Sequence, residues 1–163
     1  TETIYDSINW PAYQSSSSRV SITVKTFVIK HSTDWLPVGV REKRYGAATD
    51  TCPKCNRPET NTHLYTCQSR TAWRKQFITQ LRKHLIDTST AADLRCSIVE
   101  GIESWLLTGE MNDPESPNPA LQIGWFGVIK GFIPNQWSAL QTAFFRSQRL
   151  DASNKCHGVP DHQ

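Results

Sequence analysis

The sequence predicts a mostly α-helical fold. Two long segments, residues 69–85 and 91–108, repeat apolar side chains at the spacing of one helix face. The chain has 163 residues, which suffices for one domain with a real core or for two small lobes. Its composition is 37% hydrophobic and 20% charged, and no run of 18 apolar residues occurs, so we expect a globular chain without a membrane span.

The N-terminal third contains weaker signals. Residues 1–18 are polar and finish in four serines, which predicts a flexible lead-in. Residues 19–33 are rich in β-branched side chains, so propensity favours a strand. Fifteen residues without a turn signal are long for a strand, and a helix remains the competing interpretation. Proline and glycine within 35–39 indicate a stop, and residues 41–51 form a basic polar connector.

Residues 69–85 are predicted to form an amphipathic helix that begins at a Ser69 cap. Arg74 falls inside its apolar arc, so we expect a buried or half-buried ion pair there. We interpret Trp73 and Phe77 as core residues rather than stacking platforms, because they share this arc. The arc consists of Trp73, Phe77, Ile78, Leu81 and Leu85.

Residues 91–108 are predicted to form a second helix. Thr90 and Asp93 form a plausible capping pair at its start, and Gly109 can end it. Cys96 lies on the apolar side of this helix and is expected in the core.

The C-terminal third is divided by composition. Residues 109–119 are rich in proline and acids, which predicts a linker. Residues 120–149 are predicted to form a helical pair. Gly131 ends the first helix, and the second begins at Pro134. Residues 150–163 are polar and are expected to form a disordered tail.

Three of the five cysteines lie within sixteen residues, in the pattern Cys52-x2-Cys55-x7-His63-x3-Cys67. An odd cysteine count without a secretory signal argues against a disulfide framework and favours a metal site in a reducing compartment. The two-residue knuckle can turn both of its thiolates toward one ion. The four-residue spacing of His63 and Cys67 places their side chains on the same face of a helical turn.

Zinc prefers four thiolate or imidazole ligands in a tetrahedron, and a site with four protein ligands has no open position for water. The sequence therefore predicts one structural Zn²⁺ ion in a small helical domain, residues 19–108, with one structural zinc knuckle. One alternative is a chance cluster of free thiols around a surface histidine. A Cys67–His63 nucleophile pair is disfavoured, because a zinc-bound thiolate is a poor nucleophile. We assign the remaining candidates to the tail: Cys156, His157 and His162.

Charge is unevenly distributed, although the net charge is only +3. Residues 35–84 contain ten Lys or Arg and three acids, a net charge of +7, whereas residues 85–119 contain one base and seven acids, a net charge of −6. The asymmetry predicts a polyanion partner for the first segment. Alternatively, the two oppositely charged helices simply pack on each other. The residues expected to contact phosphates are Arg41, Lys43, Arg44, Lys54, Arg57, Lys75, Arg82 and Lys83.

The segment Trp35-Leu36-Pro37-x-Gly39, the basic connector and the run CPKCNRPETNTHLYTC resemble one family of proteins. They are similar to the zinc-binding region downstream of the polymerase domain in non-LTR retrotransposon reverse transcriptases. The stretch 122–141 also resembles the tail of such proteins, so the resemblance covers residues 19–145. The matching knuckle residues are Cys52, Pro53, Cys55, Glu59, Thr60, His63, Leu64 and Cys67.

This resemblance implies that residues 19–33 are helical and that the chain is a fragment of a longer intracellular protein, nuclear or cytoplasmic. The implied partners are RNA or DNA and a reverse transcriptase polymerase domain in cis. The chain itself contains no acidic polymerase motif fit to hold two magnesium ions, so we expect an accessory region that is not an enzyme by itself. A structural or protein-interaction module that packs on the polymerase domain, or the product of a decayed element, remains the alternative.

Overall fold

A computed structural model describes residues 4–109 and 120–156, and these residues are mostly α-helical, which confirms the predicted fold class. Within these ranges the chain forms no β-strand, although isolated bridges join Ile8 to Pro134 and Thr51 to Pro58. The α-helices are α1 (Trp10–Ser18), α2 (Ile22–Ser32), α3 (Gly39–Glu42), α4 (His63–Thr66), α5 (Thr71–Asp87), α6 (Ala92–Thr108), α7 (Ala120–Ile129) and α8 (Asn135–Cys156). Two 3₁₀ turns, η1 (Lys43–Tyr45) and η2 (Gln68–Arg70), follow α3 and precede α5.

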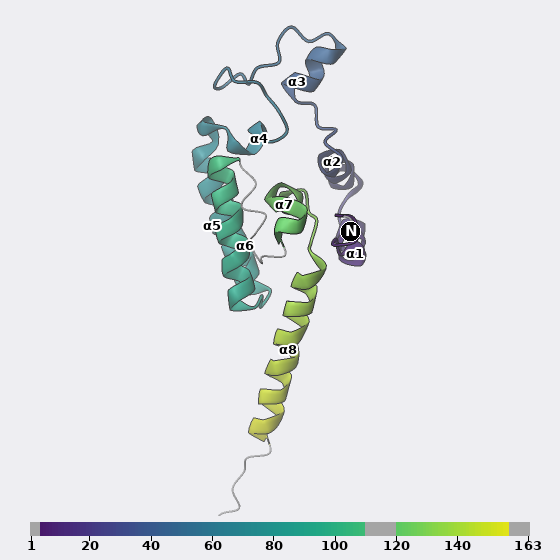
Figure 1. Cartoon of the computed structure of the whole chain (residues 1–163), viewed down its shortest axis with the longest axis vertical. Helices are drawn as coiled ribbons and strands as arrows, with labels where there is room; N and C mark the ends of the chain where they lie inside the picture. Colours follow the sequence, from purple (N-terminus) through teal and green to yellow (C-terminus); the bar gives the residue numbers. More distant parts are fainter. Residues whose placement is uncertain (1–3, 110–119, 157–163) are drawn as a thin grey trace, which may run out of the picture.

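The helices are arranged around α6. Figure 1 shows α5 and α6 lying side by side, with α7 next to α6, and α1 and α2 on the far side of α7. The connector, with α3 and α4, lies at one end of the molecule, and the long α8 extends toward the other end. No helix in the described ranges has both the length and the apolar character needed to cross a membrane.

The core forms where α6 meets α5, α7 and α8. Gly101 lies in the middle of α6 directly against the Trp125 indole; a Cβ at Gly101 would fall 1.8 Å from a Trp125 ring carbon. Trp125 follows Gly124, whose positive φ of 70° interrupts the helical backbone of α7. The buried cluster consists of Ile78, Leu94, Ile98, Val99, Ile102, Trp105, Leu106, Trp125 and Trp137.

The predicted helix caps are only partly right. The N-cap of α5 is Arg70, because Ser69 directs its hydroxyl toward the Cys67 Sγ instead, at 3.0 Å. Gly109 ends α6 in the left-handed conformation with φ of 71°, as predicted. The Cys96 prediction is wrong, since its side chain is exposed.

The start of α6 also differs from the prediction of a Thr90–Asp93 capping pair. Its N-cap is Ala91, and no side chain of the pair caps it. The Ala91 N–H donates instead to the Gln141 Oε1 of α8, at 3.0 Å, so a residue distant in sequence replaces the local cap.

The N-terminal segments are more ordered than their composition suggests. The predicted lead-in, residues 1–18, contains α1, whose Ala12 N–H donates to the Asn9 Oδ1 at 3.0 Å. Helix α1 packs through Trp10 and Tyr13 on Phe132, with ring centroids 5.8 and 5.5 Å apart. The strand interpretation of residues 19–33 is wrong, and the helical one is confirmed by α2.

The predicted C-terminal helical pair is confirmed by α7 and α8, with Gly131 between them at a φ of 94°. The predicted tail, residues 150–163, differs in its first half, because α8 continues to Cys156. The rest of that tail lies outside the described residues, as does the predicted linker after Gly109.

Candidate metal centre

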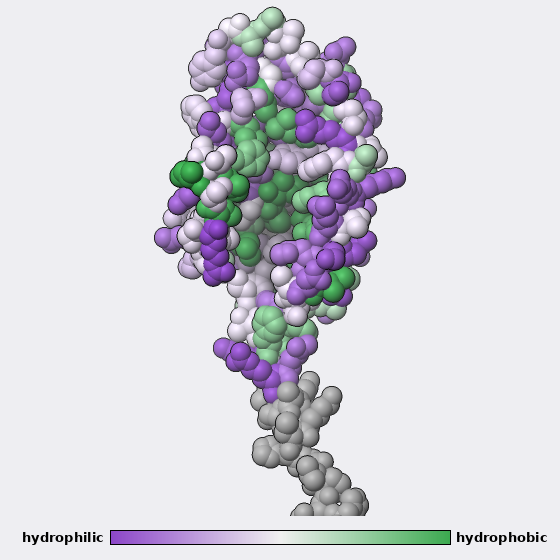
Figure 2. Space-filling model, turned by 180° about the vertical axis from the view of Figure 1, so that it is seen from behind, coloured by the Kyte–Doolittle hydropathy of each residue, from purple (hydrophilic) through white to green (hydrophobic). Residues whose placement is uncertain are grey.

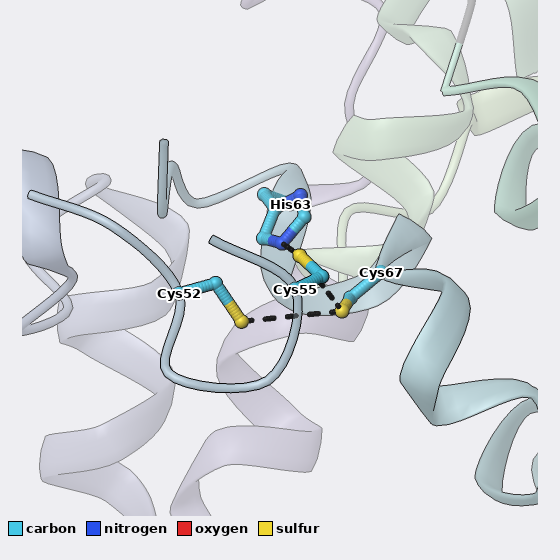
Figure 3. Close-up of side chains that lie close together, drawn as sticks. All are labelled: Cys52, Cys55, His63 and Cys67. Carbon is cyan, nitrogen blue, oxygen red and sulfur yellow. Dashed lines mark hydrogen bonds between the residues drawn. The ribbon is translucent and has the colours of Figure 1, made fainter. Parts of the chain in front are cut away.

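The four predicted ligands converge on one point. Figure 3 shows Cys52 and Cys55 on the knuckle loop, with His63 and Cys67 at the two ends of α4. The Cys55 Sγ lies 3.1 Å from the His63 Nε2 and 3.7 Å from the Cys67 Sγ. The Cys52 and Cys67 Sγ atoms are 4.0 Å apart, and all four ligand atoms lie within 4.8 Å of one another.

These distances fit a tetrahedron around a single metal ion. With zinc–sulfur bonds of about 2.3 Å, the sulfur atoms of a tetrahedral site are separated by about 3.8 Å. The two closest Sγ pairs bracket that value. Cys52 and Cys67 are buried and Cys55 and His63 are half-buried, so the site is largely enclosed by its own ligands. The cluster can therefore hold one metal ion.

A tight turn presents the first two thiols. The Cys52 carbonyl accepts the N–H groups of Cys55 and Asn56, at 3.3 and 2.9 Å. The Cys52 N–H donates to the Arg57 carbonyl at 2.7 Å, which closes the loop. Asn56 takes a left-handed φ of 58°, a conformation that asparagine tolerates better than most residues. The turn therefore places both Sγ atoms on the same side of the loop.

A single helical turn presents the other two ligands. The Cys67 N–H donates to the His63 carbonyl at 3.0 Å, and the His63 N–H donates to the Thr60 Oγ1 at 3.1 Å. The four-residue spacing therefore brings the His63 ring and the Cys67 thiol to one face, as the sequence predicted.

Neighbouring hydrogen bonds set the proton affinity of the thiols. The Ser69 hydroxyl lowers the pKa of Cys67 to about 7, with its backbone N–H and the other two thiols adding to the effect. The Arg57 backbone lowers the pKa of Cys55, but burial and the Cys67 and Cys52 thiols outweigh it and raise that pKa. Since the thiolate is the form that binds metal, Cys67 is converted into a ligand more easily than Cys55.

Arg74 connects the metal centre to α5. Its guanidinium donates to the carbonyls of Cys67, at 2.9 Å, and Tyr65, at 3.3 Å, and to the Thr71 Oγ1 at 3.1 Å. The ion pair predicted for Arg74 is therefore wrong: an arginine in the apolar arc binds two carbonyls at the end of α4 instead, and it shares the Cys67 carbonyl with the Arg70 N–H.

Glu59 fixes the other side of the knuckle. Its carboxylate accepts the Gly39 N–H at 3.0 Å, and its carbonyl accepts the Val40 N–H at 3.2 Å, so the first turn of α3 is held against the loop. The Glu59 N–H donates to the Asp50 carbonyl at 2.8 Å. Glu59 therefore has a structural role, because it holds the start of α3 against the knuckle loop. The sequence pattern contained this glutamate but did not indicate its role.

Sequence reasoning missed a polar cluster next to the metal centre. The buried His31 of α2 places its Nε2 2.6 Å from the Tyr65 hydroxyl of α4. Burial lowers the pKa of His31, the Lys130 charge lowers it further, and Asp34 opposes them. Lys130 pairs with Asp34 at 2.6 Å and lies over the Phe126 ring. These residues come from separate segments, so no local spacing signalled the cluster.

Three of the eight cations predicted to contact phosphates are engaged within the chain. The Arg41 guanidinium donates to the Asp34 carbonyl and lies 4.5 Å from the centroid of the Trp35 ring. Lys43 pairs with Asp50 at 3.2 Å, and Lys83 pairs with Asp87 at 3.3 Å. The other five are exposed and form no ion pair within the described ranges: Arg44, Lys54, Arg57, Lys75 and Arg82.

The alternative that the oppositely charged helices α5 and α6 simply pack on each other is confirmed as far as the packing goes. The two helices do pack together through their apolar faces. No ion pair joins them among the described residues, however, and Lys75, Arg82, Glu100 and Glu103 are all exposed.

Comparisons with known proteins assign no family to the chain. No protein-family model, no curated protein and no solved structure matches it.

Proposed function

We propose that the chain is a zinc-stabilised helical module that binds the phosphate backbone of RNA or DNA, as an accessory region of a retrotransposon reverse transcriptase. The observation that carries the proposal is the position of exposed cations on the metal-clamped turn. Lys54 lies between the two knuckle cysteines, and Arg57 lies two residues after Cys55. A metal that fixes this turn also fixes the two charges.

The donor set favours zinc as the metal. Three thiolates and one imidazole are soft ligands, and the closed tetrahedral shell is typical of structural zinc sites. Calcium and magnesium prefer six or more oxygen ligands, and no carboxylate belongs to the cluster. Such a site has no open position for a reacting water, so its role is to stabilise the fold.

The cations on α5 extend the basic surface beyond the knuckle. Lys75 and Arg82 are both exposed and are seven residues apart, about 10 Å along the helix and close to the same face. Phosphate contacts of this kind supply sequence-independent affinity that depends strongly on salt. The proposed role therefore requires no base-specific contact from these residues.

The assignment to reverse transcription rests on the resemblance of residues 52–67 to that family. The proposed partners are RNA or DNA and a polymerase domain in the same polypeptide, and the chain by itself has no catalytic role. Primer extension by the isolated chain, with magnesium or manganese, should show no incorporation above a control without protein. Template-dependent synthesis would contradict the accessory role.

A salt series tests backbone binding directly. The affinity of the zinc-loaded chain should fall with salt, with a log–log slope of about −0.7 for each single-strand phosphate neutralised. Replacing Lys54 and Arg57, or Lys75 and Arg82, with glutamine should make the slope shallower. Lys43→Gln is the matched control, because Lys43 already pairs with Asp50. A flat salt profile in the wild type would overturn the proposal.

A second candidate function is docking of a protein partner. An open groove of about 670 Å³ lies between α5, α6 and α8 and is lined mainly by apolar side chains. Figure 2 shows hydrophobic residues gathered in a hollow on one face of the molecule. Residues that line the groove include Leu81, Leu85, Leu94, Ile133, Trp137 and Phe145.

If a polymerase domain packs in this groove, Phe145→Ser should weaken its binding. Leu140→Ser is the matched control, because Leu140 is an exposed apolar residue of α8 that does not line the groove. This function would be favoured over nucleic-acid binding if the partner bound while the salt profile with nucleic acid stayed flat.

A further inference from the structure

A second pocket, distinct from the groove along α8, lies between the N-terminal helices and the metal centre. It has a volume of about 460 Å³, within the range typical of small-molecule sites. Helices α1, α2, α4 and α5 all contribute side chains to its wall. Aromatic residues of the wall are Tyr13, Phe27, Tyr65, Trp73 and Phe77.

The wall contains a continuous series of ring contacts. Phe27 stacks on His31, with centroids 5.8 Å apart, and His31 lies 5.4 Å from Tyr65. Tyr65 lies 6.2 Å from Trp73, which stacks on Phe77 at 5.4 Å with an angle of 13° between the ring planes. Aromatic surfaces from α2, α4 and α5 therefore line the pocket together.

Two rings of this series, those of Trp73 and Phe27, are exposed to solvent. Trp73 is 42% exposed and Phe27 is 53% exposed. The prediction that Trp73 belongs to the core is therefore wrong, because none of the helices in the described ranges covers this side of the apolar arc. An exposed tryptophan beside an apolar pocket is a ready stacking platform for a flat, aromatic ligand.

A positively charged cleft adjoins the pocket. Phe27, Tyr65 and Trp73 also line a smaller cavity of about 350 Å³, which contains the exposed Arg70. Among the described residues that line the two cavities there is no carboxylate.

We propose that this pair of cavities binds one unpaired nucleotide of a single strand, with the base among the rings of Phe27, Tyr65 and Trp73 and a phosphate at Arg70. The inference rests on the proposed function and adds the form of the nucleic acid. A base needs an aromatic surface and its phosphate needs a cation, and the two cavities supply these side by side. A paired base is stacked inside its duplex and cannot reach the rings.

Other residues of the pocket act as its floor. Lys130 is 11% exposed in its side chain and pairs with Asp34, so its charge is already compensated. His31 is buried and engaged with the Tyr65 hydroxyl. Neither is placed to attract a phosphate as Arg70 is. An aromatic side chain of a protein partner would fill the same apolar volume, but it carries no phosphate for Arg70 to bind.

The test compares hexathymidylate with a hexamer of the same length and charge in which every base is missing. The zinc-loaded chain should bind hexathymidylate about 5- to 150-fold more tightly, the range expected for stacking of one base. Trp73→Ala and, independently, Phe27→Ala should reduce this preference, with zinc content unchanged. Trp35→Ala is the matched control, because Trp35 is exposed but lines neither cavity.

The outcomes separate this inference from the proposed function. Equal, salt-dependent binding of both hexamers by the wild type would overturn the base pocket and leave backbone binding intact. No salt-dependent binding of either hexamer would overturn both. Displacement of the hexamer by N-acetyltryptophanamide but not by thymidine monophosphate would assign the pocket to a protein side chain and also overturn the inference.

Discussion

The Arg74 guanidinium donates a hydrogen bond to the carbonyl of Cys67, a residue of the cluster that can hold a metal ion, with the two atoms 2.9 Å apart. It donates a second hydrogen bond to the Tyr65 carbonyl, so one side chain of α5 binds two carbonyls at the C-terminal end of α4. The packing of α5 on α6 is thereby joined to the position of the metal centre. Through this contact, the position of α5 is coupled to the position of the knuckle.

Replacing Arg74 with methionine should lower the free energy of unfolding of the zinc-loaded chain by about 1.5 to 3 kcal/mol. The loss follows from the charge-assisted hydrogen bonds to the Tyr65 and Cys67 carbonyls, of which the Cys67 carbonyl would keep only the Arg70 N–H as a donor. Urea unfolding measures it. Lys75→Met, at the exposed neighbouring position, should change the free energy by less than about 0.5 kcal/mol. Equal effects of the two substitutions would contradict the role of Arg74.

The stability of the chain should depend on pH through His31. Burial lowers the pKa of His31 in the folded state, so below the unfolded value of about 6.5 the unfolded chain binds more protons. The contribution of neutral His31 to the free energy of unfolding is therefore fully present above about pH 6.5. It falls as the pH drops toward the folded pKa, by at most about 1.4 kcal/mol per pH unit.

His31→Gln isolates that effect, because the metal ligands are the same in both proteins. Between pH 7.5 and 5.5 the wild type should lose more unfolding free energy than the variant, as measured by urea unfolding at each pH. Parallel curves for the two proteins would contradict the lowered pKa, because they would show that His31 binds the same number of protons in the folded and unfolded states.

Gly101 should tolerate no side chain. A Cβ there would overlap the buried Trp125 indole, which has little room to move in a close-packed core. We expect Gly101→Ala to lower the unfolding free energy by at least about 1 to 3 kcal/mol. Gly127→Ala in α7 is the control, since its nearest neighbour would be 3.5 Å away and alanine favours a helix. If the Gly101→Ala chain had the same unfolding free energy as the Gly127→Ala control, the close contact between Gly101 and Trp125 would be contradicted.

The features that the sequence predicted are those set by short-range spacing. The four ligands lie within one loop and one helical turn, so their pattern alone brought Cys52, Cys55, His63 and Cys67 together. The periodicity of residues 69–85 and 91–108 predicted α5 and α6 to within a few residues. Gly109 was identifiable as a helix end because few other residues adopt its backbone conformation.

The features that it did not predict depend on contacts between distant segments. Helix α1 has a polar sequence, but Trp10 and Tyr13 gain a partner in Phe132. Ala91 is capped by Gln141, and Arg74 finds carbonyls rather than an acid. Trp73 shares the apolar arc of α5 yet faces a pocket, because no helix among residues 4–109 and 120–156 covers that part of the arc.

Metal analysis combined with thermal unfolding tests the central claim, that Cys52, Cys55, His63 and Cys67 hold one structural zinc ion. The chain purified without chelator should contain about one zinc ion, and its removal should lower or abolish the cooperative melt. His63→Ala or Cys55→Ser should have the same effect, whereas Cys96→Ser, at an exposed thiol outside the cluster, should keep both metal and melt. A zinc-free chain with an unchanged cooperative melt, or a metal content that survives the loss of His63 and Cys55, would contradict it.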